Sequence, residues 1–238
     1  MATAILSARA LGRRYGDDVA LERLDLDVME GEAVALLGPN GAGKTTALHL
    51  FLGFVGASTG SALVCGARVA DDPVATRRLL GYLPEQLALY PLLNGRENLQ
   101  YLAGLGGVDL DDAEAHRVLG ESGITSAAAE RPVRTYSKGM RQKVGIAIAR
   151  VRRAAAILLD EPLSGLDPES ARETSRLLRE LRDGGTALVV ATHDLARVGE
   201  IAQRVLILRR GHVLATFTAD ELAPGELERR YLEAVSDA

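Results

Sequence analysis

A glycine-rich segment that ends in a lysine and two threonines has the residue types and spacing to bind phosphate. The segment consists of Gly38, Pro39, Asn40, Gly41, Ala42, Gly43, Lys44, Thr45 and Thr46. It follows an apolar run, 33–37, and precedes a helix-like stretch, 45–54, the setting that gives the pattern G-x4-G-K-T its meaning. Glycines let backbone N–H groups curve around phosphate oxygens, and the helix N-terminus adds positive potential. We expect Lys44 to reach the β- and γ-phosphates and the Thr45 hydroxyl to bind Mg²⁺.

Two adjacent acids, Asp160 and Glu161, follow the strongest apolar run of the chain, 154–159. A carboxylate at a strand end can face Mg²⁺ through its water shell, and we expect this of Asp160. Because side chains alternate along a strand, Glu161 should point elsewhere. Such a pair is also common as a purely structural transition from strand to loop. Its position downstream of the phosphate segment favours the functional interpretation.

Three further side chains are ordinary when taken one at a time. His193 follows the apolar strand 187–191, and a neutral imidazole can donate a hydrogen bond to phosphate. Ser137 stands at a helix start, where a hydroxyl, backbone N–H groups and the helix dipole attract an anion. Tyr15 precedes a turn and offers an aromatic face for stacking. A structural histidine, a plain helix cap and a turn aromatic are the alternatives.

The elements that must position these side chains alternate between strand and helix patterns. Strands are predicted over 3–10, 19–28 and 33–37, and a mostly helical section over 88–152, with helix starts at Asp111 and Ser137. The remaining predicted elements are strands 155–160, 186–191 and 204–209, helices 168–182 and 194–202, and a helical stretch from Ala219. The alternation indicates an α/β fold with a mostly parallel sheet.

The bulk properties exclude several classes of protein. The 238 residues are 47% hydrophobic and 25% charged, so the chain can bury a substantial core. A net charge of -4 argues against broad nucleic-acid binding, and no nucleic-acid partner is expected. No run approaches the ~18–20 apolar residues of a membrane span, and no signal peptide is evident, so we expect a cytoplasmic chain. The single cysteine, Cys65, is expected to be a packed strand residue.

Taken in order, these motifs resemble the nucleotide-binding subunit of ATP-binding-cassette (ABC) transporters over roughly residues 3–218. The resemblance implies a P-loop NTPase core with a mostly parallel sheet, an antiparallel β subdomain and a helical subdomain at about 88–152. A single cassette domain would cover 1–218, with a short C-terminal helical tail over 219–238. ATP and Mg²⁺ would be the cofactors, and hydrolysis of ATP would power transport.

The resemblance also implies a role for each candidate residue. Glu161 would polarise the attacking water, His193 would contact the γ-phosphate, and Tyr15 would stack on adenine. The stretch Tyr136, Ser137, Lys138, Gly139 and Met140 resembles the family's signature sequence, which covers the γ-phosphate held by a second copy. The turn 164–167, which ends in Asp167, matches the loop that links the two sites. Two copies would therefore form a head-to-tail dimer, most simply a homodimer.

Two departures from the family pattern point to one branch of it. Lys138 and Met140 replace the commoner glycine and glutamine. The position that usually holds a Mg²⁺-contacting glutamine falls on Glu85, with Gln86 as the alternative. Both departures are familiar in exporters whose permease is a separate ABC-2-type polypeptide. That branch implies an integral membrane permease as partner and a peripheral location on the cytoplasmic face of the membrane.

Two other functions compete with this interpretation. The first is a soluble ABC ATPase that acts on ribosomes or DNA, but such proteins carry two cassettes or a long coiled-coil insertion. The second is a metabolite kinase that uses the phosphate segment alone, which leaves the signature stretch and His193 without a purpose. Salt-sensitive nucleic-acid affinity would favour the first of these. Phosphorylation of a small acceptor would favour the second.

Overall fold

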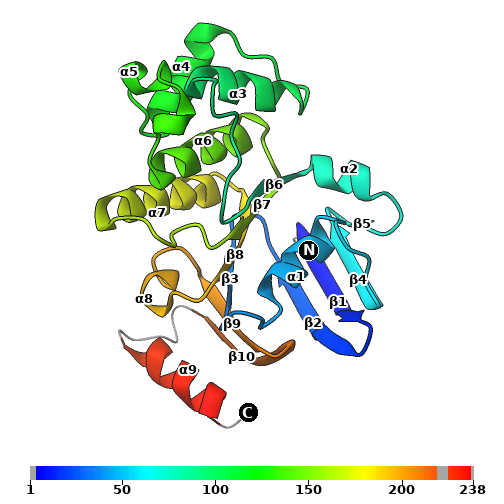
Figure 1. The fold of residues 1–238 in the computed structure, drawn as a ribbon. Coiled ribbons are helices and arrows are strands. Elements are labelled where there is room, and N and C mark those ends of the chain that lie inside the picture. The colour runs from blue at the N-terminus through cyan, green and yellow to red at the C-terminus, as the bar shows by residue number, and fades with distance from the viewer. Residues whose placement is uncertain (1–3, 219–224, 237–238) are drawn as a thin grey trace.

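The computed structural model describes residues 4–218 and 225–236. Ten strands form one curled sheet in the order β5-β4-β1-β2-β10-β9-β3-β8-β7-β6. One end of this sheet is antiparallel and the other is mainly parallel, and a group of helices extends beyond the parallel end (Figure 1). This arrangement confirms the α/β fold class with its antiparallel and helical parts.

The parallel part consists of β6 (Leu80–Leu83), β7 (Ala156–Asp160), β8 (Ala187–Thr192), β3 (Ala33–Leu37) and β9 (Arg204–Arg209). All five residues of β3 are buried, as expected of a strand covered on both faces. On one face Leu36, Leu158 and Val189 pack against α1 (Lys44–Phe51). On the other face Ile157 and Val190 pack against α7 (Pro168–Asp183). The two helices therefore enclose the strands whose ends carry the candidate site (Figure 1).

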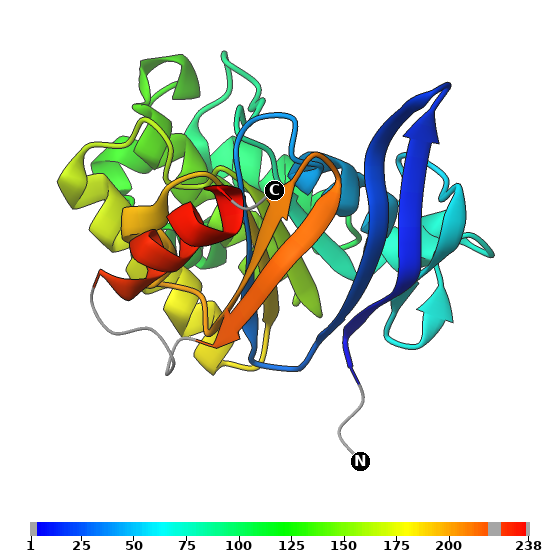
Figure 2. The ribbon, with the colours of Figure 1, turned by 90° about the horizontal axis from the view of Figure 1, so that it is seen from below.

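The antiparallel part is built on β1 (Leu6–Tyr15) and β2 (Asp18–Val28), with β4 (Thr59–Val64) and β5 (Ala67–Arg68) beside β1. Figure 2 shows β1 and β2 as a long hairpin beside the parallel strands. Alternating leucines of β2 lie in the same core as the inner face of α1. The hairpin therefore stands next to the beginning of α1, where the phosphate segment ends.

The helical part contains α3 (Gly95–Gly104), α4 (Asp112–Glu121), α5 (Ser126–Ala129), the short 3₁₀ helix η1 (Val133–Thr135) and α6 (Lys138–Val151). It has its own apolar cluster, separate from the clusters around the sheet. Asp111 and Ser137 accept hydrogen bonds from the first turns of α4 and α6, as their positions in the sequence predicted. A capping box at Asn94 and Glu97 begins α3.

Several predicted elements have different bounds in the structure. The helix predicted over 194–202 is only α8 (Leu195–Val198), because the chain turns inward to bury Ile201 and Ala202 before β9. The strand β10 (His212–Thr218), which pairs antiparallel with β9, was not predicted, nor was α2 (Pro73–Arg78). Cys65 is exposed in the turn between β4 and β5 with φ +48°, so its prediction as a packed strand residue was wrong.

A last helix, α9 (Glu226–Ser236), lies against β9 and β10 (Figures 1 and 2). Its Leu227 and Tyr231 pack on the cluster beneath these strands. Residues 219–224, the first part of the predicted tail, lie outside the described residues. None of the described helices combines the length and the apolar character required to cross a bilayer.

Candidate nucleotide-binding site

The phosphate segment connects the end of β3 to the start of α1, and its glycines are required by the backbone. A Cβ atom on Gly38 would lie 2.2 Å from the carbonyl oxygen of Leu208. A Cβ atom on Gly43 would lie 2.4 Å from the carbonyl oxygen of Ala20, and Gly43 has φ +102° at the cap of α1. Only glycine meets both conditions, so the loop can turn its N–H groups toward an anion at the helix N-terminus.

Lys44 begins α1 with its side chain buried inside this loop. Its ammonium group donates hydrogen bonds to the carbonyl oxygens of Gly38 (2.6 Å) and Pro39 (3.1 Å). Nζ also lies 3.9 Å from Oε1 of Glu161. Burial lowers the pKa of Lys44, and the nearby carboxylates of Glu161 and Asp160 oppose that effect. The loop therefore holds a positive charge at its centre, where phosphate oxygens would approach.

Thr45 and Asp160 form the part of the site suited to a divalent metal ion. The Thr45 hydroxyl donates a hydrogen bond of 2.9 Å to Oδ2 of Asp160 across 115 positions of sequence. Burial raises the pKa of Asp160, while the hydrogen bond from Thr45 acts in the opposite direction. A hydroxyl and a carboxylate at this separation are the hard oxygen donors that Mg²⁺ accepts. These residues fit the metal that the sequence implies.

Glu161 turns away from its neighbour, as the sequence predicted, because the backbone leaves the strand at this residue. Its φ is +49°, a left-handed conformation that is uncommon for a residue with a side chain. The side chain is only 11% exposed. Oε2 accepts a hydrogen bond from Oγ1 of Thr192 at 3.0 Å, and Oε1 lies 2.7 Å from Nδ1 of His193. Two side chains at the end of β8 thus fix the orientation of the carboxylate.

His193 and Thr192 therefore belong to the site in different ways. His193 has 55% of its side chain exposed, so its ring can reach solvent while it contacts Glu161. Thr192 is buried and was missed by the sequence analysis. The only signal for Thr192 in the sequence was its position next to His193 at a strand end. It also accepts a hydrogen bond from the N–H group of Asp194, so its hydroxyl connects Glu161 to the start of α8.

The signature stretch lies at the start of α6, apart from the phosphate segment. Ser137 is exposed, and its Oγ accepts a hydrogen bond from the N–H group of Met140 at 3.2 Å. Gly139 is buried, and a Cβ atom there would lie 2.9 Å from Ser170 Cβ. Within residues 4–218 and 225–236, no hydrogen bond or ion pair links residues 137–140 to residues 38–46. The two candidate segments therefore lie apart within the chain.

Asp167 is the N-cap of α7. Its Oδ1 accepts hydrogen bonds from the N–H groups of Glu169 (3.1 Å) and Ser170 (3.0 Å). Hydrogen bonding with Ser170 is the main reason that the pKa of Asp167 is lowered. Asp167 is exposed as well. A role for Asp167 beside nucleotide stays a prediction.

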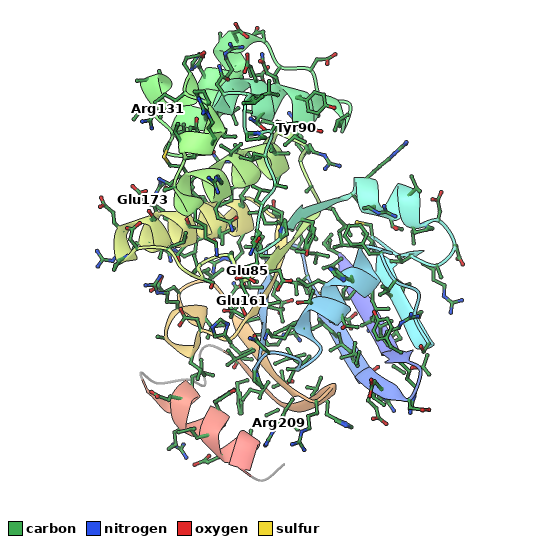
Figure 3. The ribbon with its side chains drawn as sticks, in the orientation of Figure 1. Glu85, Tyr90, Arg131, Glu161, Glu173 and Arg209 are labelled. Atoms are coloured by element: carbon green, nitrogen blue, oxygen red, sulfur yellow. The ribbon has the colours of Figure 1, made fainter. Side chains whose placement is uncertain are left out.

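Glu85 and Gln86 line the same groove, of about 410 Å³, together with Lys138 and Gln142. In the view of Figure 3, Glu85 and Glu161 both lie in the middle of the molecule, between the helical part and α1. Gln142 is buried on α6, and its side-chain oxygen and nitrogen have no hydrogen-bond partner among the described residues. The groove thus brings the residues after β6 to the helix that carries the signature stretch. It does not choose between Glu85 and Gln86.

Comparison with known proteins agrees with this geometry. The ABC transporter family matches residues 21–164, which include the phosphate segment, the signature stretch and both acids. The chain is 37% identical over 216 residues to the uncharacterized ABC transporter ATP-binding protein YdbJ of Bacillus subtilis, covering 90% of this chain and 70% of YdbJ.

This chain belongs to the ABC transporter ATP-binding family. It is also 37% identical over 218 residues to the daunorubicin resistance ATP-binding protein DrrA2 of Streptomyces coeruleorubidus, covering 90% of this chain and 67% of DrrA2. A solved dimeric structure of the cassette MJ0796, in a post-hydrolysis state with ADP and Pi, matches with a TM-score of 0.79 and 25% identity. That match covers 90% of this chain and 98% of the cassette. The chain is therefore an ABC ATPase subunit that binds and hydrolyses ATP.

Proposed function

We propose that this chain is the motor of an exporter whose membrane permease is a separate polypeptide, and that it works as a homodimer on the cytoplasmic face of the membrane. The observation that carries the proposal is the convergence of Lys44, Asp160 and Glu161 on one loop, with the signature stretch held apart on α6. Export is supported by the residues Tyr136–Met140 and Leu83–Glu85, and by similarity to a daunorubicin resistance protein.

In this proposal the protein's own residues divide the work of hydrolysis. Bound Mg²⁺ would neutralise charge on the outer phosphates and orient them. Thr45 and Asp160 would hold the metal ion, and Lys44 would exchange its bonds to Gly38 and Pro39 for phosphate oxygens. Glu161 would accept a proton from the attacking water, because Thr192 and His193 fix its carboxylate and leave no freedom to turn away.

The division of labour between Lys44 and Glu161 can be tested by two substitutions. Lys44→Ala should abolish tight ATP binding, because it removes the charge that faces the outer phosphates. Glu161→Gln should retain binding and slow hydrolysis by orders of magnitude, because a neutral amide cannot accept the proton. Equilibrium ATP binding and phosphate release would be measured for both variants. Hydrolysis at the normal rate by Glu161→Gln would overturn the assigned role.

The surface proposed for the permease lies beside the site and is both apolar and basic. A groove of about 310 Å³ is lined by Phe54, Tyr82, Arg77 and Arg152, among others. Phe54 is 49% exposed, and its ring centroid lies 5.9 Å from that of Tyr82. Tyr82 is the second-last residue of β6, and the chain continues from the end of this strand to Glu85. A short cytoplasmic helix of the permease, with apolar and acidic side chains, would fit this groove and reach the site through the residues after β6.

Recovery of partners from solubilised membranes tests the docking surface. The tagged full chain should retain a multi-spanning protein, and Phe54→Asp should lose it while its basal ATPase rate is kept. Leu232→Asp is the matched control, because Leu232 is an exposed leucine on α9, away from the groove. Recovery of ribosomes or other soluble assemblies without a membrane protein would contradict the exporter and favour a soluble ABC ATPase.

A further inference from the structure

The guanidinium group of Arg13 lies over the ring of Tyr15 near the end of β1. Its Cζ atom is 4.4 Å from the ring centroid. The two residues are two positions apart on β1, whose pairing with β2 is irregular between Arg13 and Arg14. One nitrogen of Arg13 donates a hydrogen bond of 2.8 Å to the carbonyl oxygen of Gly56. Arg13 therefore connects the Tyr15 ring to the loop that follows α1.

The Tyr15 ring is one of the main groups that interact with the charged guanidinium of Arg13. Its Nε atom is buried and has no hydrogen-bond partner among residues 4–218 and 225–236. A cation placed over an aromatic face is attracted by the electrons of the ring. Tyr15 nevertheless remains 46% exposed. Since an aromatic ring has two faces and the guanidinium covers one, the other face is open to a planar ligand.

We propose that Arg13 is a positioning residue for the base of the nucleotide. It backs the Tyr15 ring from one side, so that adenine stacks on the opposite face. The proposal rests on ATP binding by this chain and on the assignment of Tyr15 to adenine that the family resemblance implies. Arg13 is fixed by its hydrogen bond to Gly56 and in turn restricts the Tyr15 ring. The ring therefore loses less conformational freedom when the base binds. The benefit should appear in affinity for the base and not in the chemical step.

Two ligands separate positioning of the base from attraction of the phosphates. ATP carries adenine, whereas tripolyphosphate has the phosphate chain alone. Without Arg13 the Tyr15 ring would have to be ordered when the base binds, which should weaken ATP binding about two- to tenfold. We therefore expect Arg13→Gln to raise the dissociation constant of ATP by that factor and leave that of tripolyphosphate unchanged. The kcat for ATP hydrolysis should stay the same while KM rises.

Matched variants complete the experiment. Arg14→Gln removes the same charge from the adjacent residue and should alter neither ligand. Arg13→Lys keeps the charge without the planar group and should be intermediate for ATP. Thermal unfolding midpoints of all variants would confirm that they fold. Equal weakening of ATP and tripolyphosphate by Arg13→Gln would show a charge effect and overturn the proposal. Tighter ATP binding would overturn it too, because Arg13 would then occupy the face that adenine needs.

A Tyr15→Leu variant tests separately whether adenine stacks on Tyr15 and whether Arg13 positions the Tyr15 ring. Tyr15→Leu should reduce the preference for ATP over tripolyphosphate by more than Arg13→Gln does. If Tyr15→Leu leaves the preference intact, adenine does not stack on Tyr15, and both the assignment and the inference fail. If Tyr15→Leu lowers the preference and Arg13→Gln does not, only the positioning role of Arg13 is wrong.

Discussion

Asp160 and Glu161 are neighbours in sequence with the same functional group, yet the structure gives them different surroundings. Asp160 ends β7 and accepts a hydrogen bond from Thr45, on the side of the phosphate segment. Glu161 has left the strand at φ +49° and lies between Thr192 and His193. Because a positive φ is strained for a residue with a side chain, the surrounding hydrogen bonds must hold it in place. One carboxylate is thereby suited to a metal ion and the other to a water molecule.

Loss of the Thr192 hydroxyl should lower the kcat for ATP hydrolysis about tenfold. Thr192→Val keeps the shape of the side chain but removes the hydrogen bonds to Oε2 of Glu161 and from the N–H group of Asp194, so the carboxylate is held less firmly. A general base held less firmly spends less time in the reactive geometry. We expect kcat for ATP hydrolysis to fall roughly tenfold with little change in KM. Thr192→Ser keeps the hydroxyl and should hydrolyse ATP at close to the normal rate. A normal kcat for Thr192→Val would show that the hydroxyl does not orient the base.

At the scale of elements, three of the candidate site segments stand at helix N-termini. The phosphate segment begins α1, Ser137 begins α6, and Asp167 begins α7. Unpaired N–H groups and the helix dipole make such positions favourable for anions, whether these are capping side chains or phosphate oxygens. Residues at these positions can therefore act in folding and in binding at once. A substitution that keeps the cap but alters the charge separates the two roles.

Asp167 allows this separation because asparagine is also a good helix cap. Asp167→Ala should lower the thermal unfolding midpoint by roughly 2–4 °C, since it removes two hydrogen bonds to α7. Asp167→Asn should stay close to the wild-type midpoint. If the carboxylate also acts at the nucleotide, the Asn variant will lose ATPase activity without losing stability. Full activity of Asp167→Asn would limit the residue to capping.

Because the folded-state pKa of Asp167 is lowered, its capping contribution also has a defined pH dependence. The contribution is present above the ordinary pKa of an aspartate and is lost as pH falls through the lowered value. The difference in midpoint between wild type and Asp167→Ala should therefore shrink on acidification.

At the scale of the whole molecule, the phosphate segment and the signature stretch do not meet within one chain. The phosphate segment lies beside the β1–β2 hairpin, whereas α6 belongs to the helical part at the other end of Figure 1. A second copy in head-to-tail orientation would place each Ser137 over the nucleotide of its partner. ATP would then be part of the interface, and its hydrolysis would remove a binding partner from both copies.

Dimerisation should therefore depend on ATP. The Glu161→Gln chain, which retains ATP, should elute from a sizing column as a dimer with ATP and Mg²⁺ and as a monomer without them. Adding Ser137→Asp to that chain is the matched control. Aspartate still caps α6, but in the head-to-tail dimer it would bring a negative charge toward the partner's phosphate groups. The double variant should bind ATP and stay monomeric. A monomeric Glu161→Gln chain under both conditions would mean that this subunit requires its permease, or a different cassette, to pair.

Much of the fold was predictable because its signals are local. The fully apolar run 33–37 is a strand that is buried on both faces, and the G-x4-G-K-T pattern lies between that strand and a helix, as expected. Strand 204–209 was predicted with its observed bounds. These features depend on side-chain size, on glycine and on alternation over a few residues, all of which can be read along the chain. The early end of α8 and the existence of β10 were not predicted, because packing and pairing with distant segments decide where these elements begin and end.

The sequence by itself determined which chemical groups this protein has and in what order they come. Glycines, a lysine and two acids at strand ends are sufficient to predict a phosphate site and its metal ligands. The tertiary structure decided which atoms meet. Thr45 bonds to Asp160 across 115 positions, and Thr192 bonds to Glu161 across 31. The placement of Arg13 over Tyr15 and the exposure of Cys65 were likewise outside the reach of the sequence. The physical reason is that hydrogen bonds and ring contacts act over a few ångströms in space, and only the folded chain sets those distances.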